Sequence, residues 1–404
     1  MDESVTKPGP GRAPDLVVLS HLRWSWVWQR PQHLVSRLAR RRAAAGGRTW
    51  FVEEPTTGEV AEPRLEYEQL DDITRVWLVV PPGRRTALRH GFDADGAERY
   101  SELLADLLAE HGSPPRPDVW LYTPAALAIA ERLHAGRLAY DVMDDLASFR
   151  DAPEGLALRQ RRALAEADVV YAGGRSLHRA LLAQGRPDCH LFPSGVETRH
   201  YERARRLRRP RRPRRQPVAG YVGVIDERLD LPLIAELAAR LPDWTIRVVG
   251  PVAKVERASL PTSPNIQYPG MTAYEQLPEV MAGFDVALMP FALNDATRSI
   301  SPTKTLEYLA AGLPVVSTRV PDVVADYSGV VHLADDAASF ATACRAVVKH
   351  CAEDRDRRLR PVQARHEWDD IAEQMGQLLD QADQPGQAGQ AAIHGGQRSE
   401  GATA

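Results

Sequence analysis

Short apolar runs alternate with longer helical patterns along almost the whole chain, and this alternation restricts the fold more than any other feature of the sequence. The apolar runs of the first half are Leu16–Leu19, Thr49–Val52, Val76–Val80, Val119–Tyr122, Leu138–Val142, Val169–Ala172 and His190–Phe192. Those of the second half are Ala219–Val222, Ile246–Val249, Ile266–Tyr268, Val286–Met289, Val315–Ser317 and Val330–Leu333. Strands that alternate with helices form parallel sheets with helices on both faces. The sequence therefore predicts an α/β protein with two doubly wound domains.

The composition is that of an ordinary soluble globular protein. The 404 residues include 51 basic and 54 acidic side chains, with 44% hydrophobic and 26% charged residues. These values exclude collagen-like, disulfide-scaffold and wholly disordered chains. No apolar run reaches the roughly 18 residues that cross a bilayer, and the amino terminus lacks the basic-then-apolar pattern of a secretion signal. Because only three cysteines occur as well, we expect a reduced, cytoplasmic protein.

An arginine- and proline-rich segment separates the two series of strands. Residues 203–215 contain nine arginines and two prolines and almost no apolar side chain. Such a segment cannot offset the entropy of its own ordering, so it predicts a solvated linker. The segments that we expect are a disordered tail at 1–14, an N-terminal domain at 15–202, the linker at 203–217, a C-terminal domain at 218–365, a helix at 366–380 and a disordered tail at 381–404.

The arginines also allow two other interpretations. They could bind nucleic acid, or they could bind an anionic membrane, to which each arginine side chain contributes about 1 kcal/mol of attraction. The net charge is −3 and no nucleic-acid-binding fold is recognisable, so we expect no nucleic acid partner. A linker is the first interpretation, and peripheral contact with the inner face of an anionic membrane is the second.

The most informative motif is SISPTKTLEYLAAGLPVVST, residues 299–318. Ser301 is a favourable N-cap and Pro302 suits the first position of a helix, so a helix is expected to start directly after a strand end. The unpaired N–H groups of such a helix bind anions, and Lys304 adds a positive charge. Glu307 lies on the same face, about 4.5 Å further along the axis, where it could accept hydrogen bonds from a diol. A ribose diphosphate presents both groups; the alternative is a solvated Lys304–Glu307 surface pair.

These residues resemble a known family. The run from Ser301 to Thr318 is similar to the nucleotide-binding segment of retaining glycosyltransferases with the GT-B architecture, glycosyltransferase family 4, also called group 1. Residues 220–230 and 268–290 resemble its phosphate loop and base-contacting segment, and residues 192–201 its domain-crossing turn. The opening, residues 21–39, resembles a bacterial branch associated with cell-surface polysaccharide synthesis. The resemblance covers about residues 15–380 and implies two Rossmann-like domains that face a central cleft.

The resemblance also implies where a nucleotide-sugar donor binds. Glu307 would bind the ribose hydroxyls, and Lys304 and Arg228 would hold the diphosphate and neutralise it as it leaves, which makes all three catalytic candidates. The family's second glutamate, eight residues before the ribose-binding one, is replaced by Ser299, so Asn294, Asp295 or Arg298 is expected to substitute in the contact with the sugar. The donor-binding residues expected on this basis are Gly223, Arg228, Gly250, Gly270, Met271, Asp295, Arg298, Ser299, Lys304, Thr305 and Glu307.

The first domain is expected to hold the acceptor. A loop with Trp24, Trp26 and Trp28 follows the first strand, and indole rings pack well against sugars. The alternative is that two of these tryptophans close the base of the cleft as core residues. The predicted acceptor-binding residues are His21, Arg23, Trp24, Trp26, Gln29, Arg30 and Asp145.

Two adjacent carboxylates follow the strand that ends at Val142. Asp144 and Asp145 lie where many relatives carry a His-Asp pair near the reacting sugar, whereas this chain has Met143 and Asp144. Either carboxylate could orient an acceptor hydroxyl or accept its proton, and we predict that Asp144 is the catalytic one. The alternative is an N-cap for the segment that follows.

Metal-binding and P-loop chemistry are not indicated. The sequence contains no H-x-x-x-H or C-x-x-C motif and no G-x-x-x-x-G-K-[ST] loop, so we expect no metal and no cofactor. The prediction is a metal-independent glycosyltransferase, retaining by resemblance, with a nucleotide-sugar donor and a glycan, lipid-linked or small-molecule acceptor. The alternatives are a nucleotide-sugar 2-epimerase of the same architecture and a non-catalytic nucleotide-sugar-binding protein.

Overall fold

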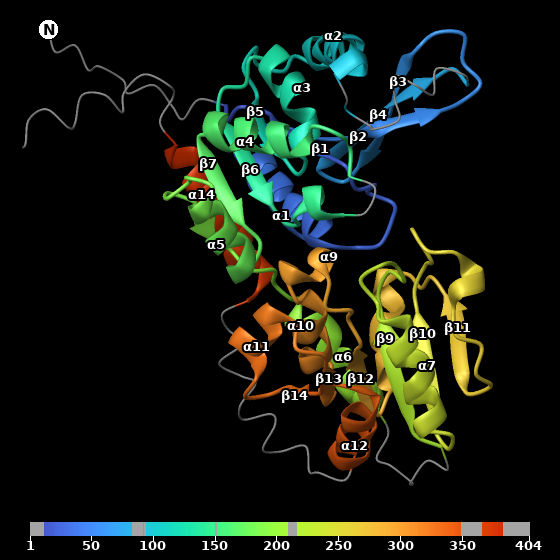
Figure 1. Cartoon of the computed structure of the whole chain (residues 1–404). Helices are drawn as coiled ribbons and strands as arrows, with labels where there is room; N and C mark the ends of the chain where they lie inside the picture. Colours follow the sequence, from blue (N-terminus) through green and yellow to red (C-terminus); the bar gives the residue numbers. More distant parts are fainter. Residues whose placement is uncertain are drawn as a thin grey trace, which may run out of the picture.

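The computed structural model describes residues 12–82, 92, 94–149, 152–208, 216–348 and 366–382, and it places two open sheets one above the other (Figure 1). The first sheet has the order β3-β4-β2-β1-β5-β6-β7-β8. Its strands are β1 (Leu16–Ser20), β2 (Thr49–Thr57), β3 (Arg64–Leu70), β4 (Ile73–Val80), β5 (Asp118–Leu121), β6 (Leu138–Val142), β7 (Val169–Ala172) and β8 (His190–Leu191). Its helices are α1 (Arg30–Ala44), α2 (Ala94–Glu110), α3 (Leu127–Arg132), α4 (Leu156–Glu166) and α5 (Arg175–Ala183).

The second sheet has the order β11-β10-β9-β12-β13-β14. Its strands are β9 (Val218–Val222), β10 (Thr245–Val249), β11 (Ile266–Gly270), β12 (Val286–Met289), β13 (Val315–Ser317) and β14 (His332–Leu333). The helices of this half are α6 (Thr198–Leu207), α7 (Leu231–Arg240), α8 (Leu277–Ala282), α9 (Asp295–Arg298), α10 (Thr303–Ala310), α11 (Pro321–Tyr327) and α12 (Ala337–Val347), and α14 (Trp368–Gln381) follows them. The predicted α/β architecture of two doubly wound domains is confirmed.

Burial explains why the apolar runs predicted the central strands well. All five residues of β1 are buried, and the strand pairs in parallel with β2 on one side and β5 on the other. A strand with neighbours on both edges and helices on both faces must be apolar along its whole length. Separate clusters of buried side chains fill the two faces of the first sheet and the interior of the second domain.

The sequence analysis missed strand β3 because its side chains are largely polar. The strand reads RLEYEQL and pairs antiparallel with β4 at the edge of the sheet. None of its residues is buried, so it lacks the apolar pattern that marks the other strands. It is the one antiparallel strand in the part of the chain that the structure describes.

The boundary between the domains differs from the expected one. Helix α6 runs to Leu207, so the first part of the predicted linker at 203–217 is helical, and residues 209–215 lie outside the described residues. Tyr201 and Ala204 of α6 are buried in the core of the second domain. The predicted boundary at 202/203 therefore falls inside a helix of the second domain, which the arginine-rich composition of the segment concealed.

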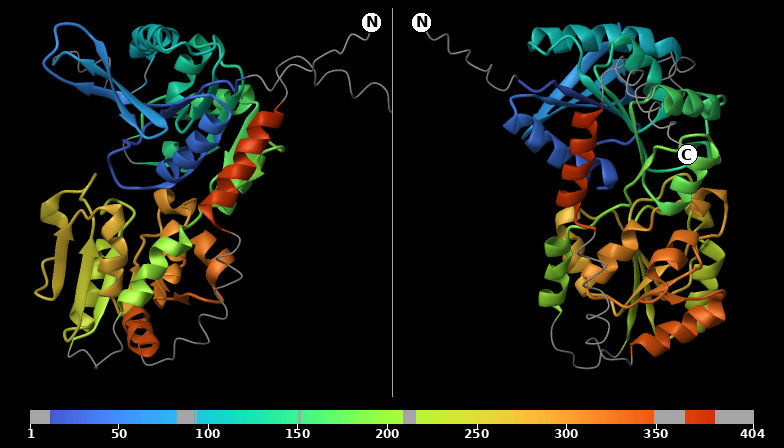
Figure 2. Two further views of the ribbon diagram at one scale, coloured as in Figure 1. Left: turned by 180° about the vertical axis from the view of Figure 1, so that it is seen from behind. Right: turned by 90° about the vertical axis from the view of Figure 1, so that its left-hand side faces the viewer.

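Helix α14 returns to the first domain, where Figure 2 shows it (red) beside the upper sheet. Trp368 and Met375 are buried among residues of α1 and the first sheet, and the Tyr171 hydroxyl donates to the carbonyl of Met375 at 2.7 Å. The chain therefore crosses between the domains twice. The two crossings lie side by side, because the Val196 amide donates to the carbonyl of His366 at 2.7 Å. Of the tails expected at 1–14 and 381–404, only residues 12–14 and 381–382 are among the described residues, and the Ala13 amide bonds to Ala45.

Candidate active site

A cleft between the two sheets consists of two adjoining hollows. The first, of about 770 Å³, is lined in part by Asp144, and we call it the Asp144 hollow. The second, of about 870 Å³, is lined by the tryptophans of loop 21–29, and we call it the tryptophan hollow. Four residues line both hollows: Val27, Trp28, Gly223 and Lys304. The cleft lies at the carboxyl ends of the parallel strands, which is where open α/β sheets bind ligands.

Two glycines shape the wall that the second domain contributes. Gly223 follows β9 and Gly250 follows β10, with backbone φ angles of +156° and +149°. A Cβ on Gly250 would lie 1.9 Å from the carbonyl oxygen of Gly223, and a Cβ on Gly223 would lie 2.5 Å from the hydroxyl of Tyr221. Because no side chain fits at either position, the two loops present bare backbone to the cleft.

Helix α10 points its amino end at the cleft. The helix begins at Thr303 after Pro302, which lines the Asp144 hollow, and no side chain caps its first turn. The prediction that Ser301 is the N-cap is wrong, because its hydroxyl instead accepts a hydrogen bond from the amide of Ser194 at 3.4 Å. Without a capping side chain, the positive end of the helix dipole is available to an anion in the cleft.

Lys304 and Glu307 lie together on the cleft side of α10. The Lys304 ammonium donates to Glu307 Oε2 at 2.8 Å. The side chain of Glu307 is only 4% exposed and that of Lys304 is 19% exposed, and both line the Asp144 hollow. These exposures do not fit a solvated surface pair. The carboxylate also affects its surroundings: burial and the charge of Glu307 raise the pKa of the Tyr201 hydroxyl well above its usual value.

Arg228 faces the cleft but is already paired. Its guanidinium donates to both oxygens of the buried Asp226, with Nη2 2.6 Å from Oδ2 and Nε 3.0 Å from each oxygen. This bidentate partner fixes the arginine at the wall of the Asp144 hollow. Asp226 balances much of its charge, as Glu307 does for Lys304, so both cations remain candidates for holding a diphosphate.

Asp144 reaches the same hollow from the first domain. Burial raises its pKa to about 6, the charges of Arg228 and Lys254 oppose this shift, and those of Asp226 and Asp145 add to it. Its carboxyl group lines the hollow across from α10. Because its pKa is about 6, the group changes charge near neutral pH. Asp145 is different: it precedes a short helical turn and accepts a hydrogen bond from the Ser148 hydroxyl at 2.5 Å, but its side chain caps no backbone amide, so the capping alternative is wrong.

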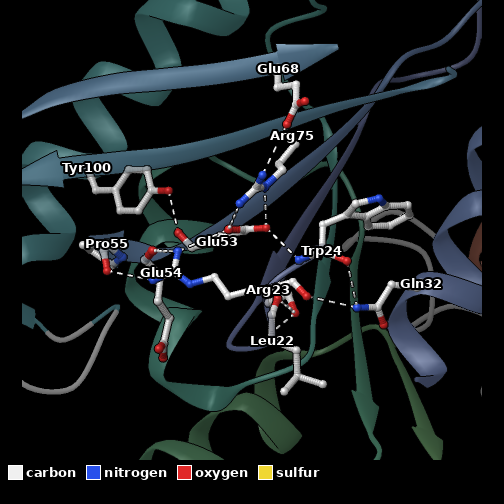
Figure 3. A network of polar contacts seen from close by, with 11 residues as sticks. Leu22, Arg23, Trp24, Gln32, Glu53, Glu54, Pro55, Glu68, Arg75 and Tyr100 are labelled. Carbon is white, nitrogen blue, oxygen red and sulfur yellow. Dashed lines mark hydrogen bonds and ion pairs between the residues drawn. The ribbon is translucent and has the colours of Figure 1, made fainter. Parts of the chain in front are cut away.

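Loop 21–29 is held to the first sheet by the network in Figure 3. The carboxylate of Glu53, in the middle of β2 and 0% exposed, accepts from the Trp24 amide at 2.7 Å and from Arg23 Nη1 at 3.2 Å. Arg23 also donates to the carbonyls of Glu54 and Pro55, so it is a structural residue of the loop. Of the predicted acceptor-binding residues, the cleft is lined by Trp24, Trp26, Gln29 and Arg30, whereas His21, Arg23 and Asp145 are not among the lining residues.

Arg30 is a lining residue whose charge is satisfied inside the protein. Its guanidinium Nε lies 2.8 Å from Asp141 Oδ2, and its Nη1 donates to the carbonyl of Phe192 at 2.8 Å. Both ion-pair partners are buried, so this contact ties α1 to β6 below the cleft.

Several predicted donor-binding residues lie outside the lining of the cleft. Asp295 and Arg298 form an exposed ion pair on α9, with side chains 71% and 75% exposed. Thr305 is fully buried, and its hydroxyl contacts the sulfur of Met289. Ser299 and Gly270 are not lining residues either, whereas Met271 and Gly250 line the tryptophan hollow. The loop before α10 reaches the cleft through Ile300, Ser301 and Pro302 instead.

Comparison with known proteins shows which enzymes the chain resembles. Residues 216–350, which span the sheet of the second domain and helix α10, match the family model described as Glycosyl transferases group 1. The second domain therefore resembles the group 1 glycosyltransferases. Among curated relatives, it is 26% identical over 275 residues to TuaH of Bacillus subtilis, described as a candidate teichuronic acid biosynthesis glycosyltransferase. That match covers 63% of this chain and 69% of TuaH.

Solved structures share the GT-B fold of this glycosyltransferase. Sucrose-phosphate synthase from Thermosynechococcus elongatus has a TM-score of 0.67 at 17% identity, covering 91% of this chain and 99% of that one. HepE of Anabaena, solved with UDP and glucose, has a TM-score of 0.65 at 14% identity, covering 91% and 100%. The UDP-forming trehalose-phosphate synthase of Burkholderia xenovorans, solved with glucose-6-phosphate, has a TM-score of 0.66 at 12% identity, with the same coverage.

No helix within the described residues is long and apolar enough to cross a membrane. In that same part of the chain, no three histidine, cysteine, aspartate or glutamate side chains cluster as metal ligands.

Three functional candidates of the glycosyltransferase were missed by sequence reasoning. Asp226 fixes Arg228, Lys254 faces Asp144 from the opposite domain with its ammonium 4.4 Å from the ring centre of Phe149, and Tyr274 stacks on Trp28. The D-x-R spacing could have suggested the first. No local signal marks the other two, because their partners belong to the other domain.

Proposed function

We propose that this glycosyltransferase moves a sugar from a nucleoside-diphosphate donor to an acceptor hydroxyl, with retention at the anomeric carbon, in the synthesis of a cell-surface polysaccharide. The observation that carries the proposal is the pair Lys304 and Glu307 at the uncapped amino end of α10, in a hollow that Asp144 faces from the other domain. The similarity to TuaH supports the polysaccharide, and the fold shared with UDP-binding enzymes supports the donor class.

The diphosphate belongs at the amino end of α10. The helix dipole, the Lys304 ammonium and the backbone of the Gly223 loop supply the positive groups there. Lys304 exchanges its bond with Glu307 for a bond with phosphate, which frees the carboxylate. Glu307 then accepts hydrogen bonds from the ribose hydroxyls, and this compensates a buried charge that would otherwise lose its partner.

The acceptor hydroxyl belongs on the Asp144 side of the cleft. Asp144 in its ionised form orients the hydroxyl, and an oxygen of the leaving phosphate takes its proton as the new glycosidic bond forms on the face that the phosphate leaves. The negative charge that develops on the phosphate meets Lys304, Arg228 and the helix end. We propose that these protein cations stabilise the leaving group without a metal ion, so that transfer continues when divalent metals are chelated.

Substitution of the pair tests the proposal. Lys304→Ala and Glu307→Ala are each expected to lower transfer at least 100-fold and to weaken nucleotide binding, as measured by product formation and by thermal shift with UDP, GDP, ADP and dTDP. The matched control is the exposed pair of the same spacing on α9: Asp295→Ala and Arg298→Ala should leave both measurements unchanged. Unchanged turnover in both α10 variants would refute the site. Isomerisation of the donor without an acceptor would instead indicate an epimerase.

A further inference from the structure

Helix α6 carries a buried tyrosine next to the candidate site. Helices α6 and α10 pack against each other in the second domain (Figure 1). Tyr201 of α6 is 1% exposed and belongs to the core of that domain. Two polar side chains adjoin its hydroxyl: the carboxylate of Glu307 on α10 and the hydroxyl of Tyr274. A polar group of the core therefore adjoins the carboxylate that the proposed function assigns to the ribose.

The Tyr201 hydroxyl is a buried polar group that is not satisfied. Neither neighbouring contact reaches the geometry of a full hydrogen bond, so among the described residues the hydroxyl has no hydrogen-bond partner. Burial of a hydroxyl without such a bond costs free energy, and folded proteins contain few such groups. Packing alone does not explain Tyr201, because a phenylalanine would fill the same space in the core without this cost.

The two neighbours of the hydroxyl differ as acceptors. Tyr274 donates its own proton to Glu197 Oε2 at 2.5 Å, so it offers Tyr201 only the lone pairs of a neutral oxygen. Glu307 accepts from the Lys304 ammonium through Oε2 at 2.8 Å, and a carboxylate has about four acceptor sites. Hydrogen bonds to an ionised acceptor are about twice as strong as those between neutral groups. Glu307 is therefore the stronger acceptor for the Tyr201 proton.

Donor binding changes the surroundings of this carboxylate. In the proposed function, Lys304 exchanges Glu307 for the diphosphate, and the ribose hydroxyls donate to Glu307 instead. The carboxylate then loses its ionic partner inside the protein although its side chain is only 4% exposed. A phenolic hydroxyl on its protein side can replace part of the lost stabilisation. Because that hydroxyl carries no charge, it does not compete for the phosphate.

We propose that the Tyr201 hydroxyl is a positioning group for Glu307: as the nucleotide binds, it donates a hydrogen bond to the carboxylate and holds it toward the ribose hydroxyls. This inference rests on the proposed function. Tyr201 lines neither hollow, so it acts on the affinity for ribose through Glu307 and not by its own contact with the donor. The hydroxyl that packing leaves without a bond thus gains an acceptor when the donor binds.

Tyr201→Phe in the full chain tests the inference. Because only the ribose contact depends on Glu307, the variant should bind the tightest-binding of UDP, GDP and ADP about 10-fold more weakly in calorimetric titration and bind inorganic pyrophosphate unchanged. The native chain should prefer that ribonucleotide to its 2′-deoxy counterpart, and Tyr201→Phe should narrow the preference. The Tm without nucleotide should not fall, since the variant removes an unsatisfied hydroxyl.

The matched control is Tyr327→Phe on α11. Tyr327 is 3% exposed and lines neither hollow, so its variant should leave nucleotide affinity unchanged. A second comparison shows whether the effect passes through Glu307. Glu307→Gln retains only a neutral acceptor, so adding Tyr201→Phe to it should lower affinity less than about threefold. The same 10-fold loss in both backgrounds would overturn the inference, because the hydroxyl would then act independently of the carboxylate.

The outcomes separate this inference from the proposed function. If Tyr201→Phe binds nucleotide within twofold of the native chain while Glu307→Ala loses it, the inference fails and the proposed function stands. If Tyr201→Phe lowers the Tm and weakens pyrophosphate as much as nucleotide, the tyrosine is a structural residue and the inference also fails. If the native chain binds none of the nucleotides, the proposed function itself fails.

Discussion

Asp144 is the residue whose ionisation most directly links the structure to activity. Burial raises the pKa of its carboxyl group to about 6, and the nearby Arg228 and Lys254 limit that rise. The group therefore changes charge close to neutral pH, unlike an ordinary aspartate. If the ionised form of Asp144 orients the acceptor, activity must depend on pH through this side chain.

We expect kcat/KM to fall as the pH drops below about 6, because Asp144 becomes protonated. Asp144→Asn should lower kcat/KM about 100-fold and remove this acidic limb. The check is a pH–rate profile of both proteins; an unchanged limb in the variant would assign it to another group.

The same shift has a consequence for stability. A folded-state pKa above the ordinary value means that the stabilising contribution is present at low pH and is lost as the pH rises from about 4 to 6. The Tm of the native chain should therefore fall as the pH rises from about 4 to 6, whereas the Tm of Asp144→Asn should not show this fall.

A second residue-scale prediction concerns Gly250. Its alanine variant would place a Cβ 1.9 Å from the Gly223 carbonyl oxygen, so the phosphate loop must move. We expect Gly250→Ala to abolish measurable nucleotide binding in a thermal-shift titration. The control is Gly112→Ala, which also has a positive φ, +66°, but no neighbour within 4 Å; it should cost about 1 kcal/mol of stability and leave binding intact.

At the scale of elements, the polar network of Figure 3 joins loop 21–29 to strands β2 and β4. The Glu53 carboxylate accepts hydrogen bonds from Arg75 Nε at 2.7 Å and Nη2 at 3.1 Å, in addition to those from Arg23 and the Trp24 amide. The buried Glu53 carboxylate thus pairs with two arginines and fixes the start of loop 21–29. Through Glu53, the β3–β4 edge of the sheet is connected to the loop that lines the cleft.

Glu53→Gln is expected to lower the free energy of unfolding by about 3 kcal/mol, because it removes the buried carboxylate that pairs with Arg23 and leaves Arg75 with only the exposed Glu68. The variant should also shift the tryptophan emission spectrum, because loop 21–29 loses its contact with the Glu53 carboxylate. It should raise the KM for the donor more than it changes kcat. Glu68→Gln is the control: this carboxylate, 51% exposed, contacts only the outer side of Arg75 and should cost less than about 1 kcal/mol. Equal effects of the two variants would argue against the anchoring role.

The elements also show how far the sequence could lead. Buried strands such as β1 and β12 were predictable, because burial on both faces demands an uninterrupted apolar run. The edge strand β3 and helix α6 were not, because their charged residues resemble those of loops and linkers. In the site, Lys304 and Glu307 were found from local spacing. Lys254 and Tyr274 were not, because their contacts with Phe149 and Trp28 form only when two domains meet.

At the scale of the whole molecule, helix α14 completes the core of the first domain although it follows the second in sequence. Trp368 is 1% exposed and stacks on His33 of α1 with ring centres 5.1 Å apart at 10°. Removal of a buried indole leaves a cavity that the surrounding side chains fill only in part. The first domain is therefore incomplete until the end of the chain has been made.

Trp368→Ala should lower the free energy of unfolding by about 3–5 kcal/mol in urea titration. The neighbouring Asp369→Ala removes only a carboxylate that is 78% exposed and pairs with Arg37, so it should cost less than about 1 kcal/mol. Similar losses in the two variants would show that α14 adds little to the core.

The two chain crossings also determine how the halves of the enzyme can separate. Val196 and Glu367 form a parallel bridge, so both connections occupy one narrow place instead of two distant ones. Because the covalent connections are confined to this place, the domains can separate furthest on the opposite side once noncovalent contacts such as the Trp28–Tyr274 stack are released. A long glycan acceptor of the kind proposed above would then enter and leave sideways, without being threaded end-first between the sheets.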